Sequence, residues 1–228
     1  MHRSESLLCY SIENFLSDQE INLVIASMDA QKAAAPTEFG DIRELGRSVH
    51  SLEGFSREET VALYEPNGRI EVDKVADGAT EILNHAVRRS FNDICRAFPS
   101  VKDFDPWIYV EYGAGQYITP HIDQANNDID MSHLKVAGIS IQLTDDFTGG
   151  ELYIETCGSH RLWADRQGDL MTAEDADYHA QWFRDLPRTR WVSKPKKGTA
   201  FFYGSQLVHG TNPVIAGAVK KILGFVKE

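Results

Sequence analysis

The hydrophobic positions in the N-terminal part of the chain recur at helical spacing in two segments. In the first, NFLSDQEINLVIASM, Ser17 and Glu20 match the capping box that begins a helix, and apolar residues then recur along one helix face. The second covers residues 73–98, DKVADGATEILNHAVRRSFNDICRAF, and ends just before Pro99. Residues 31–73 lack this periodicity and contain several glycines, so we expect loops and short strands there.

After Pro106 the chain consists of short segments that are rich in β-branched and aromatic residues and separated by turn residues. They read WIYVEYGAG, YITPHID, LKVAGISIQL, GGELYIE, GTAFFYGS and KKILGFV. This spacing is typical of an antiparallel sandwich or jelly roll. Helices followed by strands predict an α+β fold in which the helices back one face of a sheet. We expect a single domain over residues 1–228, helical to about residue 100, with a jelly-roll core from about residue 105.

Composition and charge narrow the range of partners. Hydrophobic residues make up 42% of the 228-residue chain, and the formal net charge is -11 without a long basic run. Such a chain binds phosphate backbones and anionic membranes poorly, so we expect neither nucleic acid nor membrane as a partner. No apolar run could span a bilayer, and the N-terminus lacks the apolar core of a secretion signal. The cysteines, Cys9, Cys95 and Cys157, are widely spaced, which is typical of a reduced, cytoplasmic protein.

The segment YITPHID contains the clearest candidate for chemistry. Alternate residues of a strand share a face, so His121 and Asp123 are expected to point to the same side. The best candidate for a third ligand is His209, in GSQLVHGTNPV, because a jelly roll can bring that strand end beside the first pair. Two histidines and one carboxylate form a facial triad, which suits ferrous iron and leaves coordination positions open. A histidine–aspartate pair alone can also be a simple hydrogen bond.

The other histidines lack a comparable context. His85 lies within the second helical segment, where a surface or packing role is expected. No role is assigned to His2, His50, His133, His160 or His179.

Three longer stretches resemble the prolyl 4-hydroxylase branch of the Fe(II)/2-oxoglutarate dioxygenases. YVEYGAGQYITPHID is similar to the H-x-D strand of that family, and IQLTDDFTGGELYIE to its G-G-E-L strand. PKKGTAFFYGSQLVHGTNPVIAG is similar to the strand and turn that carry its distal histidine, and FLSDQEINLVI resembles its first helix. The resemblance implies a double-stranded β-helix with iron on His121, Asp123 and His209. It also implies 2-oxoglutarate and O2 as co-substrates and ascorbate as an activator.

The same family binds the distal carboxylate of 2-oxoglutarate with a basic residue on its last strand. Lys220 and Lys221 are the candidates, and only one of two adjacent strand residues can face inward. We predict that Lys220 faces inward, which leaves Leu223 and Phe225 for the opposite, core face. By alignment with the family, Tyr112 and Gln142 are further candidates for the co-substrate pocket, although both could also be ordinary buried sheet residues.

These features predict a dioxygenase that hydroxylates an unactivated C–H bond of an amino acid, a peptidyl residue or a related small molecule, with release of succinate and CO2. Two alternatives stay open: a cupin-like metalloenzyme that does not use 2-oxoglutarate, and a non-catalytic jelly-roll binding module. The acidic charge disfavours demethylation of nucleic acids. The expected partner is therefore a small molecule or a peptide.

Residues 156–194 form a long connection between two predicted strands. It mixes aromatic residues with five arginines, Arg161, Arg166, Arg184, Arg188 and Arg190. The segment either packs on the outside of the barrel or forms a lid that selects the substrate. In the second case its arginines would favour a substrate that carries a carboxylate.

Overall fold

The computed structural model describes residues 4–50, 54–123, 135–156 and 189–228. Its helical elements are η1 (Glu5–Leu7), α1 (Asp18–Ala34), η2 (Pro36–Phe39), α2 (Ile42–Leu45), α3 (Arg57–Tyr64) and α4 (Asp77–Ala97). Its strands are β1 (Cys9–Ile12), β2 (Ile70–Val72), β3 (Asp103–Phe104), β4 (Ile108–Tyr112), β5 (Ile118–His121), β6 (Lys135–Gln142), β7 (Thr148–Gly149), β8 (Leu152–Thr156), β9 (Thr189–Ser193), β10 (Ala200–Gly204), β11 (His209–Thr211), β12 (Val214–Ala216) and β13 (Val219–Lys227).

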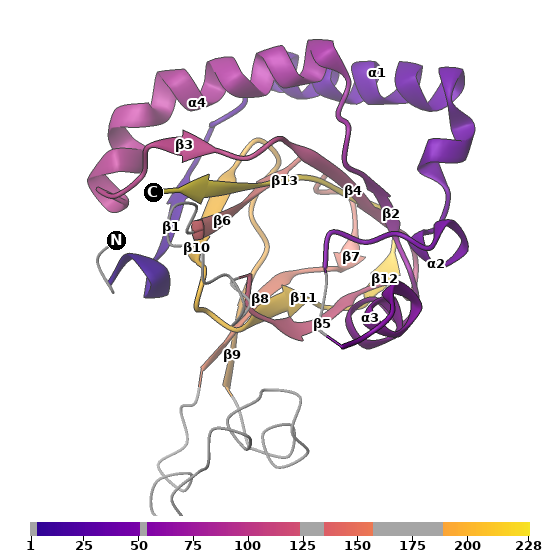
Figure 1. Cartoon of the computed structure of the whole chain (residues 1–228). Helices are drawn as coiled ribbons and strands as arrows, with labels where there is room; N and C mark the ends of the chain where they lie inside the picture. Colours follow the sequence, from indigo (N-terminus) through magenta and orange to yellow (C-terminus); the bar gives the residue numbers. More distant parts are fainter. Residues whose placement is uncertain (1–3, 51–53, 124–134, 157–188) are drawn as a thin grey trace, which may run out of the picture.

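The two long helices form where the sequence predicts them. Ser17 caps α1 with the complete capping box, in which the Glu20 carboxylate accepts a hydrogen bond from the Ser17 backbone N–H at 2.8 Å. Figure 1 shows α1 and α4 lying together across one face of the molecule, above β13 and β4. Their apolar faces pack on the large sheet in one core, to which Val24 and Met28 of α1, Leu83 and Ile94 of α4, and Ile139, Phe202 and Ile222 of the sheet contribute.

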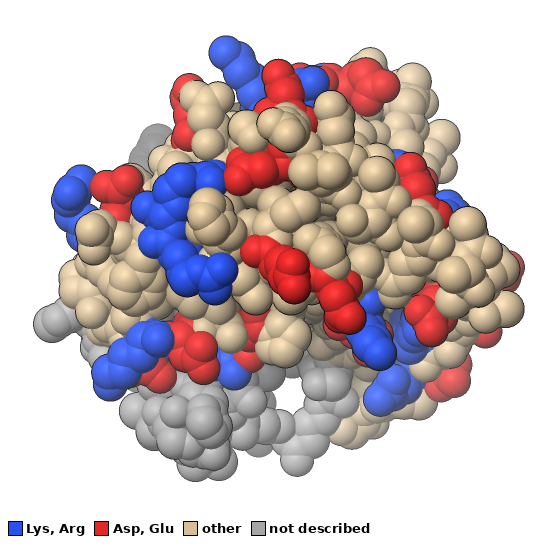
Figure 2. Space-filling model, turned by 90° about the horizontal axis from the view of Figure 1, so that it is seen from above, with Lys and Arg blue, Asp and Glu red and all other residues tan. Residues whose placement is uncertain are grey.

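The outer face of the helical layer is polar. Figure 2, seen from above, shows acidic and basic side chains mixed over this face. One such pair joins the two helices, since Arg89 Nη1 of α4 lies 2.9 Å from Glu20 Oε1 of α1. Within the described part of the chain, no helix is both long enough and apolar enough to cross a membrane.

The large sheet is antiparallel and has the order β1-β10-β6-β13-β4-β2, with β3 paired to β13 beyond this path. Its strands are not confined to the C-terminal part of the chain, because β1 and β2 come from the part before residue 100. Of these two, β2 lies in the segment 31–73 where short strands were expected, and β1 was not predicted. The segment between the long helices also contains α3, which the sequence analysis missed. Ser56 and Glu59 form a capping box at its start, and this signal could have identified it.

A second antiparallel sheet, β5-β11-β8-β9, faces the large sheet, and β12 pairs with β7 at one end. Figure 1 places β5, β11 and β8 on the side of the large sheet that faces away from α1 and α4. Two smaller apolar clusters bridge the sheets: Ile108, Tyr112 and Ile118 belong to one, and Leu152, Ile154 and Tyr203 to the other. The fold is thus α+β with antiparallel sheets, as predicted, and the space between the two sheets holds the candidate site.

Candidate metal centre

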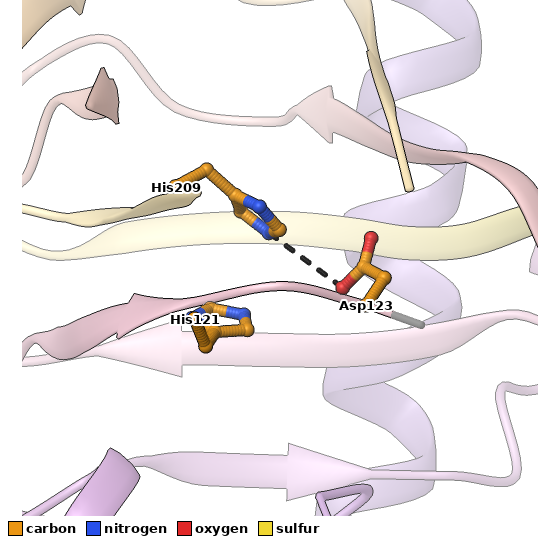
Figure 3. Close-up of side chains that lie close together, drawn as sticks. All are labelled: His121, Asp123 and His209. Atoms are coloured by element: carbon orange, nitrogen blue, oxygen red, sulfur yellow. Dashed lines mark ion pairs between the residues drawn. The ribbon is translucent and has the colours of Figure 1, made fainter. Parts of the chain in front are cut away.

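Strand pairing brings the three predicted ligands together. His121 ends β5 and His209 begins β11, and these two residues are direct partners in the antiparallel pair. Asp123 follows two residues after His121, and its Oδ1 lies 3.6 Å from His209 Nε2 (Figure 3). One ligand atom from each of the three side chains lies within 4.8 Å of the other two. Residues far apart in the sequence therefore converge on one point.

Backbone carbonyls fix the orientation of both imidazoles. His121 Nδ1 donates to Thr119 O at 2.8 Å, and His209 Nδ1 donates to Leu207 O at 2.9 Å. A carbonyl can only accept, so Nε2 of each ring keeps its lone pair. Burial lowers the pKa of both histidines, which keeps them neutral. Asp123 Oδ2 is buried and has no hydrogen-bond partner among the described residues. Two free nitrogen lone pairs and an unsatisfied carboxylate are the donors that a divalent metal takes.

Gly138 on β6 makes room for the carboxylate. A Cβ atom at this position would lie 2.4 Å from Asp123 Oδ2 and at the same distance from the Tyr203 ring. Any larger residue would therefore displace Asp123 or Tyr203. The sequence analysis placed Gly138 in a strand but gave it no role.

The triad forms part of the wall of a cavity between the two sheets. Apolar side chains such as Ile108, Leu152 and Leu223 line much of it. Its other polar residues include Arg69, Tyr112, Ser140, Thr211 and Lys221. A mostly apolar cavity with a few convergent polar groups is the usual form of a small-molecule site.

The orientation of β13 corrects the prediction for Lys220. Lys220 points away from the cavity, and its Nζ lies 3.7 Å from Asp29 Oδ1 of α1. Lys221 is 3% exposed and lines the cavity together with Leu223 and Phe225. Ile222, by contrast, packs in the core beneath the helices. The predicted phase of this strand was wrong by one residue, which moves every side chain to the other face.

Comparison with known proteins gives matches only at the level of structure. No family model matches the chain, and no curated protein matches its sequence. A prolyl-4-hydroxylase from Pseudomonas putida is 12% identical over 96% of this chain and 92% of that chain, with a TM-score of 0.56. The viral collagen prolyl hydroxylase of Paramecium bursaria Chlorella virus-1, solved as a 2OG complex, is 16% identical over 96% of this chain and 95% of that chain, with a TM-score of 0.52. AviO1 from Streptomyces viridochromogenes Tue57 is 17% identical over 96% of this chain and 89% of that chain, with a TM-score of 0.58.

The chain has the fold of the prolyl 4-hydroxylase-like 2OG-Fe(II) oxygenases. The resemblance seen in the sequence is therefore confirmed for the fold, and the His121, Asp123 and His209 cluster fits it. This oxygenase fold places the cluster and Lys221 in the same cavity.

The two further residues predicted for the co-substrate pocket, Tyr112 and Gln142, differ in position. Tyr112 is 2% exposed and lines the cavity, and its hydroxyl accepts a hydrogen bond from Arg69 Nη1. Gln142 is directly opposite Lys221 on β6 and is also buried. It is not among the residues that line the cavity, and its Nε2 donates to Thr144 O at 2.7 Å. The side-chain nitrogen of Gln142 is thus already bonded to the backbone just after the end of β6.

A buried charged cluster beside the cavity was missed by the sequence analysis. Arg69 is 1% exposed, and its Nη2 contacts Glu65 Oε1 at 3.1 Å and also Glu71. His50, which was assigned no role, lines the cavity and places Nδ1 2.7 Å from Glu65 Oε1. Its ring centroid lies 4.8 Å from that of His121. No signal in the segment LYEPNGRIEV distinguishes these charges from solvated ones, because only the tertiary fold buries them.

Because Lys221 is buried, the stability of the folded chain depends on pH. Burial lowers the pKa of its ammonium group to about 7, and the nearby Arg69 guanidinium lowers it further. Between about pH 7 and the ordinary value of 10.5, the unfolded chain therefore binds more protons at this residue than the folded chain does. The contribution of Lys221 to the free energy of unfolding rises with pH across this window and is lost as the pH falls through about 7.

We expect Lys221→Met to stabilise the metal-free, ligand-free protein by about 1–4 kcal/mol near neutral pH, because no buried ammonium remains to be desolvated. The difference from the wild type should shrink as the pH rises toward about 10. Urea unfolding of both proteins at several pH values measures it. A difference that does not change with pH would mean that Lys221 is solvated in the free protein.

Two long segments of the chain fall outside the described residues. Residues 157–188, which include Cys157 and most of the long connection, are not described, and neither are residues 124–134 directly after Asp123. The lid hypothesis for residues 156–194 therefore stays a prediction.

Proposed function

We propose that the chain is an Fe(II)- and 2-oxoglutarate-dependent oxygenase that hydroxylates an unactivated C–H bond of an amino acid, a peptidyl residue or a related small molecule. The observation that supports this best is the combination of the triad with a buried lysine in one cavity. The two facing antiparallel sheets are also consistent with a double-stranded β-helix.

The donor set fits ferrous iron. His121 Nε2, His209 Nε2 and an oxygen of Asp123 would hold the metal on one side, and the opposite coordination positions would remain open to the cavity. The carbonyls of Thr119 and Leu207 orient the two rings by accepting their Nδ1 protons. Bound iron would supply the O2 chemistry, and the chain itself supplies the ligand geometry and a largely apolar cavity.

Lys221 fits the distal carboxylate of 2-oxoglutarate. Among the described residues, no carboxylate lies within ion-pair distance of its Nζ, whose one hydrogen-bond partner is Thr211 Oγ1 at 3.4 Å. The lysine Nζ lies 5.8 Å from the centroid of the Tyr112 ring. A buried ammonium without a counterion favours an anionic ligand, which would also restore its full charge. Lys221 therefore takes the role that the sequence analysis gave to Lys220.

The test is release of succinate from 2-oxoglutarate. Purified protein would be incubated with Fe(II), ascorbate and 2-oxoglutarate, with and without a panel of free amino acids and short peptides. We expect slow release without a prime substrate and faster release with a panel member that is itself hydroxylated. Absence of both succinate and 2-oxoglutarate binding would overturn the proposal.

A further inference from the structure

A single arginine in the wall of the cavity is buried between two carboxylates. Arg69 is 1% exposed, Glu65 is 0% exposed and Glu71 is 3% exposed. Burying such a cluster is costly, and an apolar set of similar volume would often be as stable. The arrangement therefore calls for a role other than stability.

The two carboxylates hold one edge of the guanidinium and leave the other edge for Tyr112. Arg69 Nη2 contacts Glu65 Oε1 at 3.1 Å and donates to Glu71 Oε2. Glu71 is itself held in place, since its Oε1 accepts from Val49 N at 2.7 Å. Arg69 Nη1 donates to the Tyr112 hydroxyl. Arg69 Nε has no hydrogen-bond partner among the described residues, but the two carboxylates largely neutralise the guanidinium and make it a weaker partner for a further anion than Lys221.

The contact with Arg69 determines the direction of the Tyr112 proton. Arginine has only donors, so the phenol oxygen must accept this hydrogen bond and its own proton must point elsewhere. No described residue accepts that proton. Burial raises the pKa of Tyr112, so the hydroxyl stays protonated at neutral pH. Since Tyr112 lines the cavity beside Lys221, its O–H is free to donate into the space next to the ammonium.

We propose that Arg69, held by Glu65 and Glu71, is a positioning residue that fixes the Tyr112 hydroxyl as a hydrogen-bond donor to the carboxylate bound by Lys221. This inference rests on the proposed function and adds to it a residue that acts on the co-substrate through Tyr112. A cationic donor on the phenol oxygen also polarises the O–H bond and makes it a better donor. The arrangement would favour a 2-oxo acid with a second carboxylate over one without it.

The experiment is a double-mutant cycle on ligand binding. Affinity for 2-oxoglutarate would be measured by calorimetry with Mn(II) in place of Fe(II), so that no turnover occurs. We expect Tyr112→Phe to weaken binding by about 10- to 100-fold and Arg69→Met by about 5- to 20-fold. In the Tyr112→Phe background, Arg69→Met should change the affinity by less than about twofold, because its effect passes through the lost hydroxyl.

Two controls separate this role from a structural one. Arg96→Met removes an exposed arginine that pairs with Asp93 on α4, and it should leave the affinity unchanged. The ligand 2-oxobutanoate lacks the distal carboxylate, so its affinity should be insensitive to both cavity substitutions. If Arg69→Met does not fold, Glu71→Gln keeps the shape of the cluster and should weaken 2-oxoglutarate binding only when Tyr112 is present.

Each outcome decides the question. An equal effect of Arg69→Met with and without the Tyr112 hydroxyl, or no effect in either, overturns the positioning role while leaving the proposed function standing. Failure of the wild-type protein to bind 2-oxoglutarate with Mn(II) overturns the proposed function, and this inference with it.

Discussion

Replacing Asp123 by alanine is expected to weaken metal binding by more than about 100-fold and to abolish succinate release, while the protein stays folded. Loss of a residue that only supports a ligand already costs roughly 10- to 100-fold in metal affinity, and Asp123 would be the one charged ligand of the triad. Its Oδ2 has no hydrogen-bond partner among the described residues, and its Oδ1 lies 3.6 Å from His209 Nε2, so its removal breaks one long ion-pair contact and no hydrogen bond that the described residues show. Calorimetry with Mn(II) measures the loss directly.

The folded state provides an independent readout. Because the variant no longer buries an unsatisfied carboxylate, the free energy of unfolding of the metal-free Asp123→Ala protein should be at least as high as that of the wild type. Asp93→Ala is the matched control, since Asp93 is exposed on α4 and remote from the cavity. His121→Ala and His209→Ala should lose the metal in the same way. Wild-type affinity for Mn(II) in Asp123→Ala would show that the carboxylate is not a ligand.

The second large effect is expected at the end of the cavity that holds Lys221. Lys221→Ala should weaken 2-oxoglutarate binding by about 2–5 kcal/mol, which is roughly 30- to several-thousand-fold, because the distal carboxylate would be buried without a partner. Lys220→Ala is the matched control on the neighbouring residue. Lys220 pairs with Asp29 at 3.7 Å on the helical side of the sheet, and its loss should change the affinity by less than about twofold.

The same pair of variants distinguishes binding from turnover. With saturating 2-oxoglutarate, Lys221→Ala should recover part of its succinate release, since the metal ligands are untouched. The reverse pattern, with Lys220 sensitive and Lys221 silent, would mean that β13 faces the other way in solution.

Local patterns were enough to predict the main elements. The capping box at Ser17 and the apolar face that follows it define α1, and the same kind of pattern defines α4. Alternation along a strand also predicted that His121 and Asp123 converge, and they do, although β5 ends at His121 and Asp123 lies just beyond it. The helix predictions succeed because they depend on residues a few positions apart, whose relative orientation is set by the backbone geometry of the helix itself.

The phase of β13 illustrates what local patterns could not decide. The strand lies between β4 and β6, with the helical core on one face and the cavity on the other. Both of its faces are therefore covered, and Ile222 and Leu223 point to opposite sides although both are apolar. A strand buried on both sides has no polar face from which its phase can be read. Only the pairing with its neighbours places Lys221, and not Lys220, in the cavity.

By itself, then, the sequence determined the two long helices, most of the strands and the convergence of His121 and Asp123. It also indicated, through its likeness to one family, which distant histidine would join them. The tertiary structure alone decided that His209 is the direct strand partner of His121, that Lys221 faces the cavity, and that Glu65, Arg69 and Glu71 are buried behind Tyr112. The reason is physical: the charge environment of a side chain depends on which segments pack against it, and that packing joins residues whose separation in the sequence carries no periodic signal.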